Sequence, residues 1–416
     1  MTRTSRRTRP RTTVRACGAL LSAALLAAAL QATAAPPASA AKPDGRGGPE
    51  CVRTEGPLRG DAARVMDIVR KAKGELRLKA VNVRVVDDGR EVVTDALGES
   101  MTNVPAEPDM HFRAGSVVFS YLGTILLQLV EEGKIGLDDT VDRWLPSLPH
   151  ADKITLRMLG SATSGLHDYV TDPKFGAALT AHPFRQWTPK ELVGYSLSHP
   201  LWYKPGTNWS YSHANFVLLV AALEKITGTR VDELVRQRVT GPLGLHNTRN
   251  NFTPDIPGPV LHAFTSDRGL YEESTFWNPS WTTAPGAVIT SHICDLARSA
   301  EGIGSGELLS RRAYRTLLDP GTVGLGRATK TCPATVCVKQ TKDHHFGLGV
   351  LVVNGWVVQN PSFSGYAAIK AYLPSERLAI AVAASQTATT PDGNTAEVVA
   401  ERIAAELAPG VPLTVQ

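Results

Sequence analysis

The chain has 416 residues and a formal net charge of +5, with 44 Lys and Arg against 39 Asp and Glu. Six of the arginines and none of the acids lie before Ala41, which leaves 38 bases against 39 acids in the rest of the chain. A near-neutral chain without a basic run gives no support to a nucleic-acid-binding class.

The first forty residues have the layout of a secretory signal. A basic start is followed by an apolar run from Ala16 to Leu30 and by small residues that end in "ASA" before Ala41. The apolar run is too short to span a bilayer comfortably, so we expect no stable membrane insertion. We predict a secreted protein with a signal peptide at 1–40 and a Pro/Gly-rich flexible tail at 41–60.

Residues 60–101 predict a helix followed by a hairpin. The segment "GDAARVMDIVRKAKGEL" places Val65, Ile68, Val69 and Ala72 at helical spacing. "VNVRVV" then alternates with period two, and Asp88-Gly89 turns the chain into "EVVTDALG".

The middle of the chain is mostly helical, and strands return near its end. The predicted helices are Ser116–Glu132, Pro189–Leu197, Asn215–Ile226, Arg230–Val239 and Cys294–Ala300. The later predicted strands are "FGLGVLVV", "WVVQN", "YAAIKAYL" and "LAIAVAAS", and a helix at Thr395–Leu407 follows them. This order predicts an α/β domain over 61–416, with an antiparallel sheet built from both chain ends. A helical lobe, 116–306, would be inserted, with a cleft between the lobes.

Four cysteines remain beyond the signal, an even number suited to an oxidising compartment. The spacing of "TCPATVCV" favours a local Cys332–Cys337 bond, which leaves Cys51 for Cys294. The other two pairings remain formally open. A four-cysteine metal site is the weaker interpretation, because Cys51 and Cys294 have no ligand partners nearby in the sequence.

Ser116 opens the first helix of the middle segment, in "HFRAGSVVFSYLGTILLQLVEEGKIGLDDTV". A serine at a helix N-terminus can serve as a nucleophile, because the free N–H groups there favour an anion. It can equally be an ordinary N-cap. One turn later the sequence has Phe119, which cannot accept a proton. Phe119 is either a core residue or a filler of the space that a base would occupy.

Several segments resemble, in order, the serine β-lactamase and penicillin-binding protein superfamily, in particular its class C β-lactamase, D-Ala-D-Ala carboxypeptidase and esterase branch. The similar segments are "FRAGSVVFSYLGTILLQLVEEGKIGLDDTVDRWLP", "ITLRMLGSATSGLHDY", "KPGTNWSYSHANFVLLVAALEKITG", "APGAVITSHICDLARSA" and "GELLS". The resemblance covers most of the chain beyond the signal. It implies the β-lactamase/transpeptidase-like fold and a serine hydrolase ancestry.

Each of the three family motifs is altered in this chain. The family's Ser-x-x-Lys reads Ser116-Val-Val-Phe119, so the lysine that helps to deprotonate the serine is replaced. Its Tyr-x-Asn reads Tyr211-Ser-His213. Its Lys-Thr-Gly or His-x-Gly strand reads Asn360-Pro361-Ser362, in a register uncertain by a residue or two. A proline there removes a backbone donor that a substrate would need.

Two hypotheses follow. In the first, the chain is a non-catalytic descendant, impaired for β-lactam and D-Ala-D-Ala acyl transfer. It would bind a small acyl, peptide or cell-wall-derived ligand in the cleft, with Phe119, Asn360, Ser362 and Phe363 among the contacts. In the second, Ser116 still attacks an ester or amide. Tyr211 and His213 would then move protons, and the Ser116 N–H with a donor near Phe363 would form the oxyanion hole.

We expect no metal or organic cofactor in either case. His213 could alternatively be a hydrogen-bonded structural residue. Tryptophans near the predicted cleft loops could form an apolar subsite, although core packing is the commoner role; they are Trp202, Trp209, Trp277 and Trp281.

Overall fold

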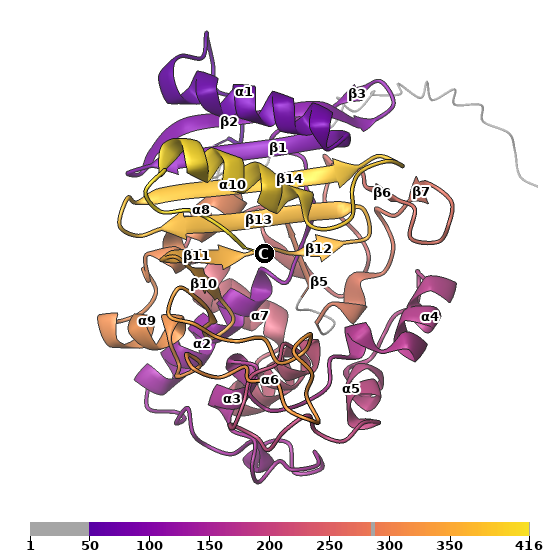
Figure 1. Ribbon diagram of the computed structural model, residues 1–416, viewed down its shortest axis with the longest axis vertical. Helices are drawn as coiled ribbons and strands as arrows, with labels where there is room; N and C mark the ends of the chain where they lie inside the picture. The colour runs from indigo at the N-terminus through magenta and orange to yellow at the C-terminus, as the bar shows by residue number, and fades with distance from the viewer. Residues whose placement is uncertain (1–49, 284–287, 416) are drawn as a thin grey trace, which may run out of the picture. The chain divides into compact units, whose positions relative to one another are not determined.

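The computed structural model describes residues 50–283 and 288–415. The predicted signal peptide and residues 41–49 of the predicted tail lie outside the described residues. Figure 1 shows one large sheet with helices on both of its faces and a mostly helical region on one side.

Among the described residues, the large sheet is antiparallel and has nine strands, ordered β3-β2-β1-β14-β13-β11-β10-β9, with β12 paired to β13. Its strands are β1 (Leu78–Asp87), β2 (Arg90–Met101), β3 (Val104–Pro105), β9 (His344–Phe346), β10 (Leu351–Val353), β11 (Trp356–Gln359), β12 (Ser362–Phe363), β13 (Tyr366–Leu373) and β14 (Leu378–Gln386).

The two ends of the chain meet in the centre of this sheet. β1 pairs antiparallel with β14, so that Val83 lies opposite Val382 and Val85 opposite Ile380. Figure 1 shows the indigo N-terminal strands beside the yellow C-terminal ones. The prediction of an antiparallel sheet built from both chain ends is therefore confirmed.

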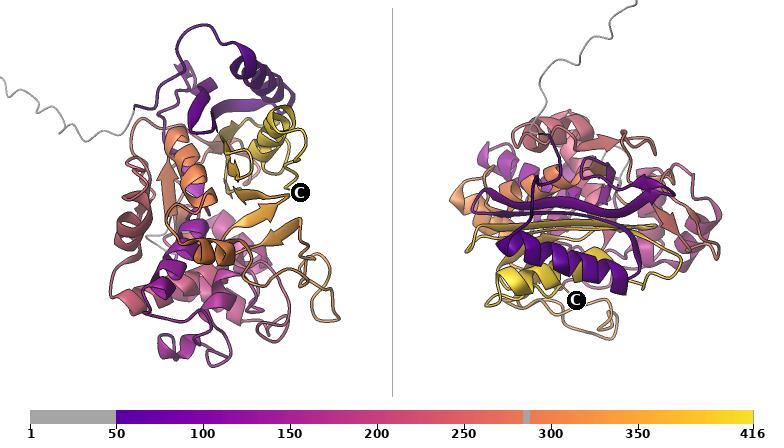
Figure 2. Two further views of the ribbon diagram at one scale, coloured as in Figure 1. Left: turned by 90° about the vertical axis from the view of Figure 1, so that its left-hand side faces the viewer. Right: turned by 90° about the horizontal axis from the view of Figure 1, so that it is seen from above.

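Helices from both chain ends cover one face of the sheet, and α8 (Ile293–Gly304) covers the other. α1 (Gly60–Glu75) and α10 (Thr395–Leu407) bury Val65, Val69, Val399 and Ile403 against the strands. Seen from above, in the right panel of Figure 2, α1 and α10 lie together on one side of the sheet and the helical lobe lies on the other.

The inserted lobe contains most of the remaining helices. They are α2 (Val118–Glu131), α3 (Leu156–Gly160), α4 (Pro173–Ala181), α5 (Pro189–Leu197), α6 (His213–Thr227), α7 (Val231–Val235) and α9 (Arg311–Leu318). A small antiparallel sheet joins β4 (Phe112–Gly115), β8 (Val288–Ser291) and β5 (Arg249–Asn251), and a hairpin joins β6 (Phe264–Thr265) to β7 (Glu272–Glu273).

Local sequence signals explain where several helices begin and end. Thr188 and Glu191 form a reciprocal capping box at α5, which occupies the predicted range. Gly228 ends α6 with a φ of 67°, a conformation that favours glycine. The helix predicted over Arg230–Val239 is instead the short α7 followed by a π-turn at Arg236–Thr240.

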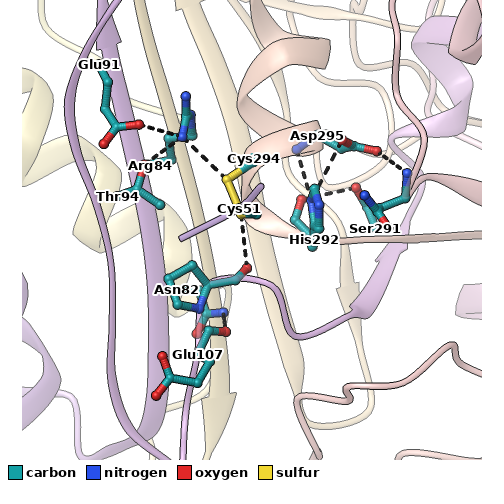
Figure 3. The surroundings of a disulfide bond; sticks show 12 residues. Cys51, Asn82, Arg84, Glu91, Thr94, Glu107, Ser291, His292, Cys294 and Asp295 are labelled. Carbon is teal, nitrogen blue, oxygen red and sulfur yellow. Dashed lines mark hydrogen bonds and ion pairs between the residues drawn. A yellow bond between two sulfur atoms is a disulfide. The ribbon is translucent and has the colours of Figure 1, made fainter. Parts of the chain in front are cut away.

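Two disulfides join Cys51 to Cys294 and Cys332 to Cys337, which confirms the favoured pairing. Figure 3 shows the first bond beside Arg84, whose guanidinium donates to Glu91, to Thr94 and, at 3.4 Å, to the Cys294 sulfur. Such bonds are typical of extracytoplasmic proteins. Within the described residues, no helix has the length and apolar character that crossing a membrane requires.

Candidate active site

Ser116 lies in the turn between β4 and α2. The strand ends at Gly115, which has a φ of 37°, and the helix begins at Val118, two residues later than expected. The N-cap residue is Val117, so Ser116 is not the capping residue. Ser116 is partly exposed, and its hydroxyl makes no hydrogen bond to any residue that the structure describes. The hydroxyl is therefore accessible but has no base bound to it.

Phe119 fills the position one helical turn after Ser116. Its side chain is 1% exposed and stacks face to face on Phe216, with the ring centroids 3.7 Å apart. The centroid of the His213 ring lies 5.9 Å from that of Phe119 in an edge-on arrangement, and the centroid of the Tyr211 ring lies 6.4 Å away. A phenyl ring packed in this way excludes water and offers no proton acceptor to Ser116.

His213 is bound to a carboxylate that the motif comparison did not include. Its Nδ1 lies 3.0 and 3.1 Å from the two carboxylate oxygens of Asp168, and its backbone N–H donates to the same group. This contact favours a proton on Nδ1 and leaves the Nε2 lone pair of a neutral ring available. The arrangement is that of a carboxylate-oriented imidazole. Among the described residues, no hydrogen bond joins it to Ser116.

Tyr211 stands edge-on to His213, with ring centroids 5.1 Å apart. Burial raises the pKa of Tyr211 well above its ordinary value, and the negative charge of Asp168 adds to the shift. The hydroxyl therefore stays protonated at neutral pH. It can donate a proton but cannot serve as a phenolate base.

The altered strand motif divides between the two faces of the sheet. Asn360 directs its amide toward α10, where it donates to Glu397 at 2.7 Å. Pro361 lies on the opposite side, and its Cβ is 3.2 Å from where a Cβ on Gly115 would stand. Gln359 also lies on this opposite side and donates to the Gly349 carbonyl. Of these residues, Pro361 is the one next to the Ser116 turn, whereas Asn360 points away from it.

Phe363 and Ser362 follow on β12. Phe363 is buried and stacks on Trp281, with centroids 5.5 Å apart. Tyr169 fixes Trp281 by donating its hydroxyl to the Trp281 carbonyl at 2.7 Å. Ser362 is exposed, and its hydroxyl donates weakly to the Tyr366 carbonyl at 3.4 Å. Trp281 is thus the tryptophan that meets a predicted site residue.

A buried lysine, Lys370, was not identified from the sequence. Its Nζ donates to Ser120 at 3.0 Å and to Ser299 at 2.8 Å. Ser120 is one turn along α2 from Ser116. Burial lowers the pKa of Lys370 well below its ordinary value of 10.5. The sequence feature that could have pointed to this buried lysine is its place in the otherwise apolar strand segment "YAAIKAYL".

The chain is similar in sequence to known proteins. A sequence profile described as Beta-lactamase matches residues 65–405. The chain is 31% identical to penicillin-binding protein 4 of Amycolatopsis lactamdurans over 175 residues, covering 41% of this chain and 43% of that protein. It is 29% identical to the D-alanyl-D-alanine-carboxypeptidase/endopeptidase AmpH of Escherichia coli (strain K12) over 180 residues, covering 41% and 45%. The match thus spans less than half the length of these relatives.

Solved structures with a similar fold are also known. The D-stereospecific amidohydrolase from a Streptomyces species superposes with a TM-score of 0.69 at 26% identity, covering 84% of this chain and 99% of that one. The penicillin-binding protein from Bacillus halodurans superposes with a TM-score of 0.65 at 19% identity, covering 82% and 100%. The second likeness shows the fold alone.

Proposed function

The chain belongs to the beta-lactamase family, and we propose that it has lost the family's lysine-dependent acyl transfer while keeping a ligand-binding site around Ser116. In this proposal the protein is secreted and binds a small acyl or peptide ligand, with cell-wall fragments as the first candidates. The N-terminal signal-like segment and the two disulfides support an extracytoplasmic location.

The position of Phe119 is the observation that carries this proposal. The phenyl ring is stacked on Phe216 and occupies the position where the family has its lysine. Tyr211 cannot compensate, because its raised pKa keeps it protonated. Ser116 therefore has no activated base among the residues that the family uses.

Intact mass spectrometry tests the loss of acyl transfer. The secreted chain is incubated with a penicillin, and Ser116→Ala is treated in the same way as the control. We expect no acyl adduct on either protein. Rapid stoichiometric acylation that depends on Ser116 would contradict the proposal, because it would require an activated serine.

Thermal unfolding tests the binding site. A ligand that binds the folded state alone raises the melting temperature. We expect an acyl-D-alanyl-D-alanine peptide to stabilise the wild type and to have no effect on Ser116→Trp, in which the indole would fill the site. If the peptide shifts both proteins equally, or neither, the proposed ligand class is wrong.

A second candidate function rests on the contact between Asp168 and His213. A carboxylate that orients an imidazole through Nδ1 is the arrangement that lets Nε2 act as a general base. In this candidate, Ser116 attacks an activated ester or amide and His213 accepts its proton. Tyr211 donates a proton to the leaving group, and the Ser116 N–H with a donor near Phe363 stabilises the oxyanion.

A fluorophosphonate probe separates the two candidates, because it labels activated serines without needing a matched substrate. The active hydrolase predicts an adduct that disappears in Ser116→Ala and in His213→Ala. The binding protein predicts no adduct on a chain that circular dichroism shows to be folded. An adduct that persists in His213→Ala would exclude His213 as the base.

A further inference from the structure

The connection between α9 and β9 carries a net positive charge. Residues 319–343 contain four bases, Arg327, Lys330, Lys339 and Lys342, and two acids, Asp319 and Asp343, at the two ends of the segment. These bases are spread along the segment, so they do not form a basic run in the sequence. Their grouping is therefore a property of the fold.

Folding brings the two limbs of this connection side by side. The N–H of Gln340 donates to the Leu325 carbonyl at 2.9 Å, and the N–H of Gly324 donates to the Gln340 carbonyl at 2.9 Å. The Cys332–Cys337 bond closes the tip. Gly326 packs so closely that an added Cβ would stand 1.8 Å from the Val338 carbonyl oxygen. Arg327 and Lys339, the next residues on the two limbs, are thus neighbours.

The connection is also fixed to the helical lobe. The Asn208 amide donates to the Arg327 carbonyl at 2.7 Å and accepts from the Arg327 N–H at 2.9 Å. The Thr331 hydroxyl donates to the Trp202 carbonyl at 2.9 Å. These contacts place the exposed Lys204, in the turn between Trp202 and Asn208, beside the same surface. We call these five bases (Lys204, Arg327, Lys330, Lys339 and Lys342) the basic loop.

All five side chains are exposed. Within 50–283 and 288–415, none of them forms an ion pair, and none of their charged groups makes a hydrogen bond. Some other surface bases in the lobe are paired, as in Arg230–Asp232 and Arg236–Glu233. Figure 2 shows the connection as an orange loop at the edge of the protein, where a large partner can reach it.

We propose that the basic loop binds a linear phosphate polymer. Four of the five bases are lysines, whose compact ammonium groups bind phosphate oxygens as point charges. The disulfide and the Asn208 contacts hold the backbone in place before binding, which lowers the entropy cost of association. Residues 320–342 contain no Phe, Tyr or Trp, so the loop offers no ring for stacking nucleobases.

The test is binding of the full secreted chain to fluorescent polyphosphate of defined length, measured by anisotropy at several salt concentrations. Four or five contacts to a flexible polyanion predict that log K falls with log salt at a slope of about −3. The variant R327E/K330E/K339E/K342E should lose at least tenfold in affinity. The milder variant R327Q/K339Q should show an intermediate loss of affinity. It replaces the fourfold variant in the test if the fourfold variant does not fold.

A matched control changes the same charge elsewhere. The control variant is K153E/K174E/K190E/K225E. It changes four exposed lysines of the helical lobe that make no ion pair within the described residues. We expect this control to keep most of the wild-type affinity. Equal losses in both variants, or no binding by the wild type, would overturn the proposal. Equally tight binding of polyglutamate with the same charge would overturn the assignment to phosphate.

Discussion

Phe119 lies flat on Phe216, with an interplanar angle of 10°, in the turn of α2 that follows Ser116. The stack belongs to a cluster of rings that also includes Tyr211, His213 and Phe346. A catalytic lysine in this place would have to share its surroundings with these rings. Phe119 is therefore part of the core of the helical lobe, as the proposed loss of lysine-dependent acyl transfer requires.

Phe119→Ala should destabilise the protein by about 3–5 kcal/mol, because it removes a fully buried phenyl ring and leaves a cavity. The measurement is urea unfolding followed by circular dichroism. Phe184→Ala is the control, since Phe184 is 67% exposed and should change stability by less than about 0.5 kcal/mol. Similar small losses in both variants would mean that the Phe119 ring is not packed as described.

The two disulfides should contribute unequally. Chain-entropy reasoning gives about 5 kcal/mol for the Cys51–Cys294 bond, whose partners are 243 residues apart. The same reasoning gives about 2 kcal/mol for Cys332–Cys337, at a separation of 5. Thermal unfolding of C51A/C294A and C332A/C337A checks the order. A larger loss in the second variant would show that the short loop does more than restrict the unfolded chain.

Lys370 should make stability rise with pH on the alkaline side. In the folded state its pKa lies well below 10.5. Between the folded-state pKa and 10.5, the unfolded chain therefore binds one more proton than the folded chain. Stability then increases as pH rises toward 10.5. Melting temperatures from pH 7 to 9.5 should rise in the wild type relative to Lys370→Met. The range stops there because unfolded tyrosines ionise near pH 10. Parallel curves for the two proteins would contradict a lowered pKa of the buried amine.

Asp168→Ala should cost about 1–3 kcal/mol, because it removes the acceptor for the His213 backbone N–H and for its ring. Asp168 also accepts from the Val170 N–H at the start of a short helical turn. Asp168→Asn keeps one acceptor oxygen and should lose less. Chemical denaturation of both variants gives the comparison, and equal losses would indicate that the carboxylate charge matters more than the hydrogen bonds.

Much of the fold could be predicted from local patterns. The alternation in "VNVRVV", the Asp88-Gly89 turn and the helical spacing in residues 60–76 are set by neighbours in the sequence. The structure accordingly has α1, β1 and β2 near the predicted positions. The sequence predicted a continuous helix over Arg230–Val239 and gave no sign of the π-turn at Arg236–Thr240. The spacing of apolar residues does not reveal such a turn, which depends on packing.

The candidate site was less predictable, since it depends on contacts between residues that are far apart in the sequence. Motif comparison located Ser116, Phe119, Tyr211 and His213, but not Asp168, which is far from His213 in the sequence. Whether Asn360 faces Ser116 depends on the register of β11, and the structure turns its side chain toward Glu397. A lysine in a strand gives no sign of which hydroxyls it will meet, as Lys370 shows.

The pairing of β1 with β14 has a consequence for how the protein reaches its folded state. β1 is the first strand of the sheet and pairs with β14, its last, so the central sheet cannot close until residues 378–386 have been made. Contacts between such distant residues make folding slow and leave strand edges exposed meanwhile. This delay suits the secretion proposed above, because a core that cannot form early in synthesis leaves the chain unfolded for export.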